Sequence, residues 1–162
     1  GSHWIMDENN VWKPRPNGSV SPVYSQSVTT TSVNVNQTPA IAINFNNSSP
    51  STAGIFDLTA SRRQVLQDGD YRIAYSVNAE NNTNSRKNVR FRLRKNGTVF
   101  ITGSVSSGYA RNGSHKELSG SSSVIVSLAA GDYVELTAIR VGTTGNCFLT
   151  DANLNLEKID NA

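Results

Sequence analysis

Strict alternation of apolar and polar residues in three stretches is the feature that most limits the fold of this chain. Residues 71–77 place a large apolar side chain at every second position, and residues 89–94 and 133–141 repeat the pattern. Because successive side chains of a β-strand point to opposite faces of a sheet, this period of two predicts strands with one buried face. No stretch sustains the apolar period of an amphipathic helix, so we expect an all-β chain.

Turn-forming residues separate the alternating stretches. Asp68-Gly69-Asp70 precedes the first stretch, Asn96-Gly97 closes a predicted hairpin after the second, and Gly131-Asp132 precedes the third. With the shorter alternating runs, the sequence predicts about eight to ten antiparallel strands, at the spacing of a sandwich or closed barrel. The remaining predicted strands cover residues 32–36, 41–46, 54–58, 64–66, 98–102, 124–128, 147–149 and 151–159, and the predicted polar loops cover residues 47–52 and 103–123.

The first part of the chain, residues 1–27, differs from the rest. It has no apolar period and contains several prolines, which favour extended chain over helix. The opening Gly-Ser-His resembles a cloning remnant, so His3 carries no functional argument. We expect an extended leader here, or a stem that joins the head to a fibre shaft or packs on the head through Trp4 and Trp12. Residues 28–162 then form the head domain, which is long enough to bury a core without disulfides.

Composition argues against several function classes. Only 17% of the residues are charged and the formal net charge is +3, a smaller excess than a nucleic-acid-binding chain usually carries. Cys147 is the single cysteine, in an apolar context that favours a buried side chain, and His115 is the only histidine outside the remnant. The sequence shows no metal-ligand spacing and no apolar run of membrane-spanning length. We therefore expect no enzymatic activity, cofactor, metal ion, nucleic-acid partner or membrane insertion.

Four segments, in order, resemble the jelly rolls of the tumour-necrosis-factor-like and complement-globular-head-like family. Residues 69–75 (GDYRIAY) are similar to its G-x-Y-x-hydrophobic strand, and residues 92–98 (RLRKNGT) are similar to its L-x-x-N-G hairpin. Residues 128–136 (LAAGDYVEL) resemble its L-x-x-G-D-x-V-x-L strand, and Phe148 with residues 154–156 fits its last strand. The resemblance implies a jelly-roll sandwich that assembles as a homotrimer, with one sheet of each subunit facing the three-fold axis.

The alternation separates a core face from an outward face in two of these strands. On the core face we expect Tyr71, Ile73, Tyr75, Val77, Val134, Leu136 and Ala138. The outward positions of residues 133–141 include large apolar side chains, which would form an exposed patch in a monomer. We therefore expect the trimer interface to contain Arg72, Tyr133, Glu135, Thr137 and Ile139, with the arginine and the glutamate as polar partners. The alternative is an ordinary solvated face.

A row of arginines is the first candidate for ligand binding. Apolar residues occupy one face of residues 89–94, so Arg90, Arg92 and Arg94 share the other face, about 7 Å apart. The planar guanidinium fork binds carboxylates, phosphates or sulfates, which makes the row a candidate site for an acidic glycan or a cell-surface phosphate polymer. Aromatic residues do not share this face of the strand, which disfavours a nucleic acid. In the alternative, the row is a solvated strand face that uses arginine for solubility and edge protection.

The long predicted loop, residues 103–123, is the second candidate. A loop of this length in a compact domain is unusual and often functional. Its larger polar side chains suit a sugar ring, on which they would stack and to which they would donate hydrogen bonds: Tyr109, Arg111, His115 and Lys116. The alternative is a mobile surface loop without a ligand.

The richness in asparagine and serine is more similar to phage and bacterial members of this family than to vertebrate ones. The resemblance therefore implies a receptor-binding, glycan-binding trimeric head of a phage tail fibre or spike, on a virion surface or an extracellular bacterial surface. Its partners would be two further copies of itself and a host cell-surface glycan or acidic polymer. The alternative is a structural or assembly module of a virion or bacterial surface fibre, with no ligand of its own. Because fold does not fix function, the choice depends on the sites.

Overall fold

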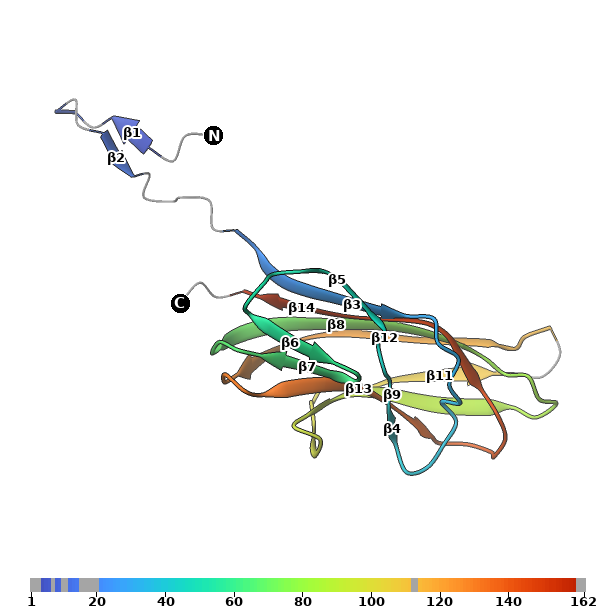
Figure 1. The fold of residues 1–162 in the computed structure, drawn as a ribbon. Helices are drawn as coiled ribbons and strands as arrows, with labels where there is room; N and C mark the ends of the chain where they lie inside the picture. The colour runs from blue at the N-terminus through green and yellow to red at the C-terminus, as the bar shows by residue number, and fades with distance from the viewer. Residues whose placement is uncertain (1–3, 7, 10–11, 15–20, 112–113, 160–162) are drawn as a thin grey trace.

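The computed structural model describes residues 4–6, 8–9, 12–14, 21–111 and 114–159, and the regular structure in this part of the chain is β throughout (Figure 1). Among these residues there is no helix with the length and apolar character that crossing a membrane requires. The strands are β1 (Trp4–Met6), β2 (Trp12–Pro14), β3 (Val23–Thr29), β4 (Ile41–Ala42), β5 (Asn47–Ser51), β6 (Phe56–Thr59), β7 (Arg62–Val65), β8 (Gly69–Glu80), β9 (Lys87–Lys95), β10 (Val99–Phe100), β11 (Ser106–Ala110), β12 (Glu117–Leu128), β13 (Tyr133–Arg140) and β14 (Phe148–Lys158).

Most strands belong to two antiparallel sheets that stack as a sandwich (Figure 1). Sheet I has the strand order β12-β8-β14-β3-β5. Sheet II has the order β10-β9-β13-β7-β6, with β11 also pairing with β9 and β4 also pairing with β13. β1 and β2 form a separate two-stranded sheet. The prediction of an all-β antiparallel sandwich is confirmed.

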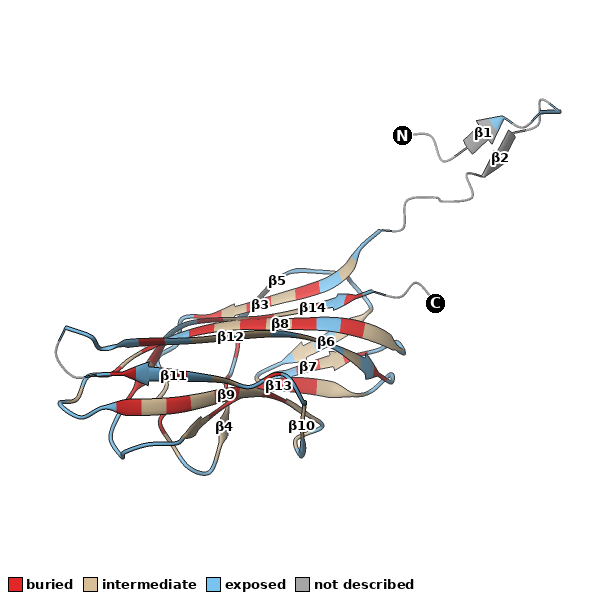
Figure 2. Cartoon of the chain, turned by 180° about the vertical axis from the view of Figure 1, so that it is seen from behind, coloured by how far each residue is buried: buried red, intermediate tan, exposed pale blue. Residues whose placement is uncertain are grey.

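The core lies between the two sheets and follows the predicted alternation. Figure 2 shows buried bands alternating with more exposed ones along β8 and β9. β8 and β13 contribute side chains that are at most 2% exposed: Tyr71, Ile73, Tyr75, Val77, Val134, Leu136 and Ala138. Each fully buried large apolar side chain stabilises the fold by roughly 1.5–3 kcal/mol. The core predicted for these two strands is confirmed residue by residue.

One hydroxyl group in this core has several polar neighbours. The Tyr75 Oη donates to the Ser104 carbonyl at 2.6 Å and lies 2.8 Å from the Ser106 Oγ. The Ser104 Oγ in turn accepts a hydrogen bond from the Leu93 amide at 2.9 Å. Burial raises the pKa of Tyr75. Because β8 lies in sheet I and β9 in sheet II, these contacts hold the segment between β10 and β11 against both sheets.

The largest departure from the sequence prediction lies in residues 103–123. Most of this predicted loop is strand, since β11 pairs with β9, and β12 pairs with β8 along its full length. The outward positions of β12 are mainly serines, so its alternation lacks the apolar contrast that marks a strand in a sequence. Gly120 is required in β12, because a Cβ at this position would lie 2.5 Å from the Ser106 Oγ and 2.7 Å from the Phe91 ring.

Smaller departures concern the segment before β6. The predicted loop at residues 47–52 contains β5, an edge strand paired with β3. The predicted strands at residues 32–36 and 41–46 shrink to one isolated bridge at Asn34 and the two-residue β4. Their inward apolar residues still lie in the core: Val35, Ile43 and Phe45. The alternation therefore predicted burial correctly here and strand pairing incorrectly.

The sandwich starts before the expected domain boundary at residue 28. β3 begins at Val23 and pairs with β14 in sheet I, so the residues from Val23 onward belong to the head. Further upstream, β1 and β2 pair through their backbones. The expected packing of the Trp4 and Trp12 side chains on the head lies outside what the structure describes.

The sandwich has two distinct ends. At one end, which we call the root, Lys158 of β14 pairs with Val23 of β3 and with Tyr71 of β8. At the other end, the tip, Glu80 of β8 pairs with Glu117 of β12. Figure 1 shows the chain entering β3 and leaving β14 at the root. The 12 residues of β8 separate the two ends by about 36 Å.

Candidate functional site

The residues predicted to bind a sugar come together at the tip. They line one hollow, which is formed by Tyr109, Arg111, Ser114, His115, Lys116 and Glu117. The first two belong to β11 or directly follow it, and the others precede or open β12. The sequence identified Tyr109, Arg111, His115 and Lys116 but assigned them to a long loop, whereas strands support both sides of the hollow. It did not single out Ser114 or Glu117.

Backbone hydrogen bonds fix the two sides of this hollow. The Arg111 amide donates to the His115 carbonyl at 2.8 Å. The Asn81 amide donates to the Lys116 carbonyl at 2.8 Å, and the buried Asn81 side chain donates to the Arg111 carbonyl at 3.3 Å. Lys116 forms an ion pair with Glu80, and the hydrogen bond to this carboxylate raises the pKa of the lysine.

The hollow combines an aromatic ring with hydrogen-bond donors. Tyr109 is 50% exposed, so its ring is accessible to a ligand. An exposed tyrosine offers an apolar ring and a polar hydroxyl to the same ligand, and Arg111 and His115 add donors along the same rim. The arrangement suits a sugar unit, whose ring faces are apolar and whose edges are polar.

The arginine row lies on the outward face of sheet II, as predicted, but its three members have different environments. Arg94 donates two hydrogen bonds to the Glu135 Oε2, from Nε at 3.2 Å and from Nη2 at 2.9 Å. The Arg92 guanidinium lies over the Phe100 ring, with its Cζ 3.1 Å from the ring centroid. The Arg90 side chain has no ion pair or hydrogen bond with any residue that the structure describes.

The row carries surplus positive charge. Glu135 is the one carboxylate that pairs with it among the described residues, and its other oxygen accepts a hydrogen bond from the Ser61 Oγ at 2.9 Å. Desolvation lowers the pKa of Arg92, and the neighbouring charges of Arg90 and Arg94 lower it further. The sequence did not reveal Glu135 as a partner of the row, because β13 is placed beside β9 only by the fold.

The side chains predicted for one trimer interface lie on opposite faces of the sandwich. Arg72 belongs to β8 and faces outward from sheet I. The other four belong to β13 in sheet II: Tyr133, Glu135, Thr137 and Ile139. Within one chain, Arg72 pairs with Glu157 at 3.2 Å and Glu135 pairs with Arg94, so Arg72 and Glu135 are not partners inside a subunit. Alternation shows which residues share a face of a strand, but not which sheet the strand joins.

The β13 residues of that prediction also do not form an open patch. The Arg62 guanidinium lies over the Tyr133 ring, 4.5 Å from the ring centroid. Glu135 and Thr137 are only 5% and 1% exposed within a single chain. Tyr133 and Ile139 are half-buried, so this set offers little apolar area to a partner.

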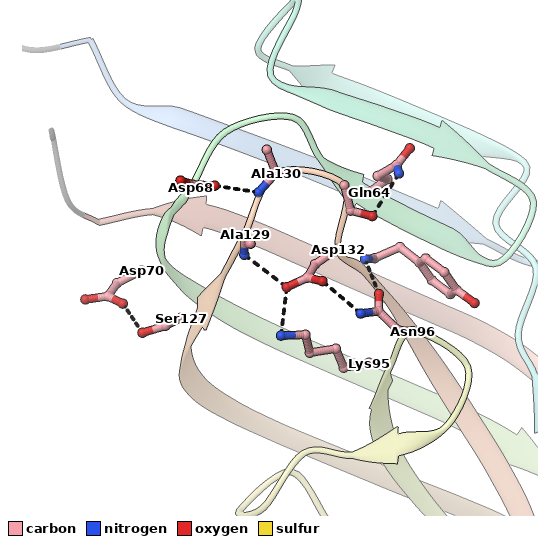
Figure 3. Close-up of polar contacts among 11 residues, drawn as sticks. Gln64, Asp68, Asp70, Lys95, Asn96, Ser127, Ala129, Ala130 and Asp132 are labelled. Atoms are coloured by element: carbon pink, nitrogen blue, oxygen red, sulfur yellow. Dashed lines mark hydrogen bonds and ion pairs between the residues drawn. The ribbon is translucent and has the colours of Figure 1, made fainter.

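The carboxylates of the turn motifs bind protein groups at the root, as Figure 3 shows. Asp132 accepts hydrogen bonds from the Asn96 Nδ2 at 2.8 Å and from the Ala129 amide at 3.0 Å. It also forms an ion pair with Lys95 at 2.7 Å, and these contacts, led by the Asn96 hydrogen bond, lower the pKa of Asp132 to about 2. Asp68, in the turn before β8, accepts a hydrogen bond at 2.7 Å from the Ala130 amide, in the turn before β13. The sequence predicted Asp68 as a turn residue, and the structure adds that Asp68 and Asp132 join neighbouring turns.

Metal binding and thiol chemistry find little support in the described part of the chain. No three His, Cys, Asp or Glu side chains there gather as metal ligands would. Cys147 is fully buried, as predicted, and burial raises the pKa of its thiol to about 11. A thiol with this pKa stays protonated near neutral pH and is a poor nucleophile.

Comparison with known proteins bears on the fold. No family model and no curated protein matches the sequence. The globular domain of zebrafish complement 1qA matches with a TM-score of 0.60 at 15% identity, over 86% of this chain and 98% of its own. Murine APRIL at pH 5.0 matches with a TM-score of 0.62 at 10% identity, over 86% of this chain and 100% of its own. The chain folds as a C1q/tumour-necrosis-factor-type jelly roll.

The motifs that carried the resemblance have clear positions in this jelly roll. Residues 69–75 open β8, the strand of sheet I between β12 and β14. Asn96 of the N-G motif and Asp132 of the G-D motif bind each other at the root. The motifs therefore specify the sandwich and its turns, and at these sequence identities the likeness shows the fold alone.

Proposed function

We propose that this chain is the head of a homotrimeric fibre, a binding module without enzymatic activity whose tip binds a cell-surface glycan. The observation that carries the proposal is the opposition of the two ends. The chain enters and leaves the sandwich at the root, and the hollow with Tyr109, Arg111 and His115 lies at the tip. A fibre attached at the root would hold the hollow at its free end, as a phage tail fibre, a spike or a bacterial surface fibre requires.

The outward face of sheet I is the surface best suited to pack against further copies. Two rows of paired residues cross it: Ser123, Ala74, Asn155 and Gln26, and then Ile125, Arg72, Glu157 and Tyr24. The first row is small and uncharged. The second row contains one positive and one negative side chain, and these two already pair with each other.

Covering these rows would leave no charge without a partner. Burying an isolated charge is costly, whereas small polar and apolar side chains are tolerated at an interface. Ile125 and Tyr24, at 59% and 38% exposed, stand at opposite ends of the second row and would each lose apolar exposure in an assembly. We therefore place the trimer contact on sheet I.

Solution mass tests the assembly. We expect size exclusion with multi-angle light scattering to give a mass near three chains for the purified protein. A monomer at micromolar concentration would contradict the assembly and remove the proposed role of sheet I.

A glycan array tests the tip, with binding of each hit then measured by calorimetry. The double variant Arg111→Ser/His115→Ser removes two donors from the hollow and should lose the binding of wild-type hits. Arg86→Ser is the matched control, because this exposed arginine precedes β9 and does not line the hollow. Unchanged binding by the tip variant would contradict the proposed site.

A structural head without a ligand is the second candidate. It is favoured by the two rows of sheet I, whose charges already pair within the chain, because a role in assembly needs only further copies. A wild-type trimer that binds no glycan on the array and no host cell would favour this candidate over the first.

A further inference from the structure

The outward face of sheet II holds two cationic side chains that the fold leaves without anionic partners. Arg90 and Arg92 occupy alternate positions of β9, about 7 Å apart, and neither pairs with a carboxylate among the described residues. Glu135 is the acid in register with the row. It lies opposite Arg94 and already forms an ion pair with it. Like charges at this spacing repel each other, and a bound anion would relieve the repulsion.

Local packing holds this pair of arginines in place. Phe100 lies under the Arg92 guanidinium, and the Arg92 Nε is enclosed without a hydrogen-bond partner. Arg90 is flanked in register by Ser107 of β11 and Ile139 of β13. A guanidinium whose plane is fixed by a ring loses less freedom when it binds an oxyanion.

We propose that Arg90 and Arg92 form an anion-binding shelf, which accepts carboxylate or sulfate groups of an acidic polysaccharide. Charge-assisted hydrogen bonds from a guanidinium fork match such oxyanions. The shelf lies on the opposite sheet from the proposed trimer contact, and neither arginine lines the tip hollow. Tyr109 pairs with Asn88, so it shares the outward face of the shelf and connects it with the tip. A sugar chain bound at the shelf would pass Tyr109 to reach the tip hollow.

A nucleic acid fits the same charges less well. Binding of single strands depends on exposed aromatic rings that stack on successive bases. Phe100 and Tyr133 beside the row are each covered by a guanidinium, from Arg92 and Arg62 respectively, which leaves Tyr109 as the single exposed ring on this face among the described residues. One ring cannot stack on successive bases. Two unpaired arginines also give few phosphate contacts, and such contacts supply most of the affinity of non-specific binding. A polysaccharide that contacts the shelf through single oxyanions needs neither feature.

Isothermal titration calorimetry of the full chain tests the shelf. The probes are an oligogalacturonate of defined length, which carries carboxylates, and a dextran sulfate oligosaccharide, which carries sulfates. We expect at least one probe to bind, and Arg90→Gln/Arg92→Gln to weaken its binding by about tenfold or more, because two charge-assisted contacts are lost. Arg86→Gln removes the same charge as Arg90→Gln from an exposed position off the shelf, and should leave the affinity nearly unchanged.

Thermal unfolding without ligand separates a binding role from a structural one. Arg90→Gln should leave the Tm unchanged or raise it, because Arg90 pairs with no described side chain and repels Arg92. Arg94→Gln should lower the Tm, because it breaks the ion pair with Glu135. A marked fall in Tm for Arg90→Gln would show a structural role and overturn the shelf.

Other results overturn the proposal in distinct ways. Equal losses in Arg90→Gln and Arg86→Gln would show that net charge alone attracts the probe. Equal affinity for a single-stranded DNA of matched charge would show a generic polyanion site, and inorganic sulfate binding as tightly as the sulfated probe would show an adventitious ion only. The tip variant Arg111→Ser/His115→Ser distinguishes the two proposals, since a shelf that keeps its affinity in this variant stands even if the tip binds no glycan.

Discussion

The outward faces of the two sheets are built on the same alternation, and they differ in size and charge. Across sheet I, the row through β8 consists of small or uncharged residues: Ser123, Ala74, Asn155 and Gln26. Across sheet II, the row through β9 consists of large or charged ones: Phe100, Arg94 and Glu135. The inward residues of both sheets have to fill one core, whereas the outward residues are free to differ. The proposed assembly surface and the proposed ligand surface therefore lie on outward faces of different size and charge.

We expect the largest effect, on the solution mass, from a variant that places a charge on the outward face of sheet I. Ala74→Arg puts a guanidinium at the centre of the neutral row, where an uncompensated buried charge costs about 3–5 kcal/mol in each subunit. We expect the mass from light scattering to fall from three chains to one. Ser107→Arg places the same charge on the outward face of sheet II, beside Arg90, and should leave the mass unchanged. An Ala74→Arg protein that stays trimeric would move the interface away from sheet I.

The next effect compares the ion pairs of the two faces. The Arg94–Glu135 pair has side chains that are 19% and 7% exposed, whereas the Arg72–Glu157 pair is about half exposed on both sides, at 50% and 49%. Glu135→Gln should lower the free energy of unfolding by about 3 kcal/mol, because it leaves a poorly solvated guanidinium unpaired. Glu157→Gln should change it by at most about 0.5 kcal/mol. Urea unfolding followed by circular dichroism, at matched chain concentrations, measures both, and equal costs would show that the two pairs do not differ as their exposure indicates.

The same contrast explains how much of the fold the sequence predicts. β8, β9 and β13 were predicted because bulky apolar residues alternate with polar ones in each of them. β12 was predicted as a loop over much of its length, because Ser119, Ser121 and Ser123 alternate with residues such as Gly120 that offer little apolar contrast. A strand whose outward face consists mainly of serines is therefore harder to recognise in a sequence than one with charged outward residues.

The candidate sites also differ in how far the sequence predicts them. The arginine row shares one strand, so its common face follows from the alternation alone. The pairs Arg94–Glu135 and Arg72–Glu157 join different strands, and their register depends on which strands become neighbours. For this reason, the pairing of Arg72 with Glu157 within one chain could not be predicted from the sequence. The period of a strand predicts which of its residues share a face. Contacts between strands also depend on the strand order and register, which the period does not give.

A third expected effect concerns the edge where the two sheets meet. Gly120→Ala places a methyl group against the Ser106 Oγ and the Phe91 ring, so β12 has to move away from β11 and β9. Overpacking of this kind costs about 1–3 kcal/mol. Ser121→Ala, at the next and exposed position, should stay within about 0.5 kcal/mol. Thermal unfolding of both variants measures the difference, and a neutral Gly120→Ala would mean that the edge is loosely packed.

The smallest expected effect lies at the root, outside both faces. The pKa of Asp132 is lowered from 3.8 to about 2, chiefly by the Asn96 hydrogen bond and then by Lys95. A carboxylate whose pKa is lower in the folded state stabilises the fold above its unfolded pKa, and this contribution disappears as the pH falls through the folded value. Since the site is partly solvated, we expect about 1 kcal/mol, lost between about pH 4 and pH 2.

Asp132→Asn should therefore reduce the free energy of unfolding near neutral pH, and its difference from wild type should shrink as the pH approaches about 2. Urea unfolding of both proteins across this range measures the difference. If the difference in free energy of unfolding stayed constant with pH, the stabilisation would come from the packing and neutral hydrogen bonds of this side chain and not from its negative charge. The variant should also keep the trimer mass and the affinity of the arginine shelf, because Asp132 belongs to the turn before β13 and contributes to neither outward face. A change in either property would show that the root controls the faces, and that the two sheets are coupled through their turns.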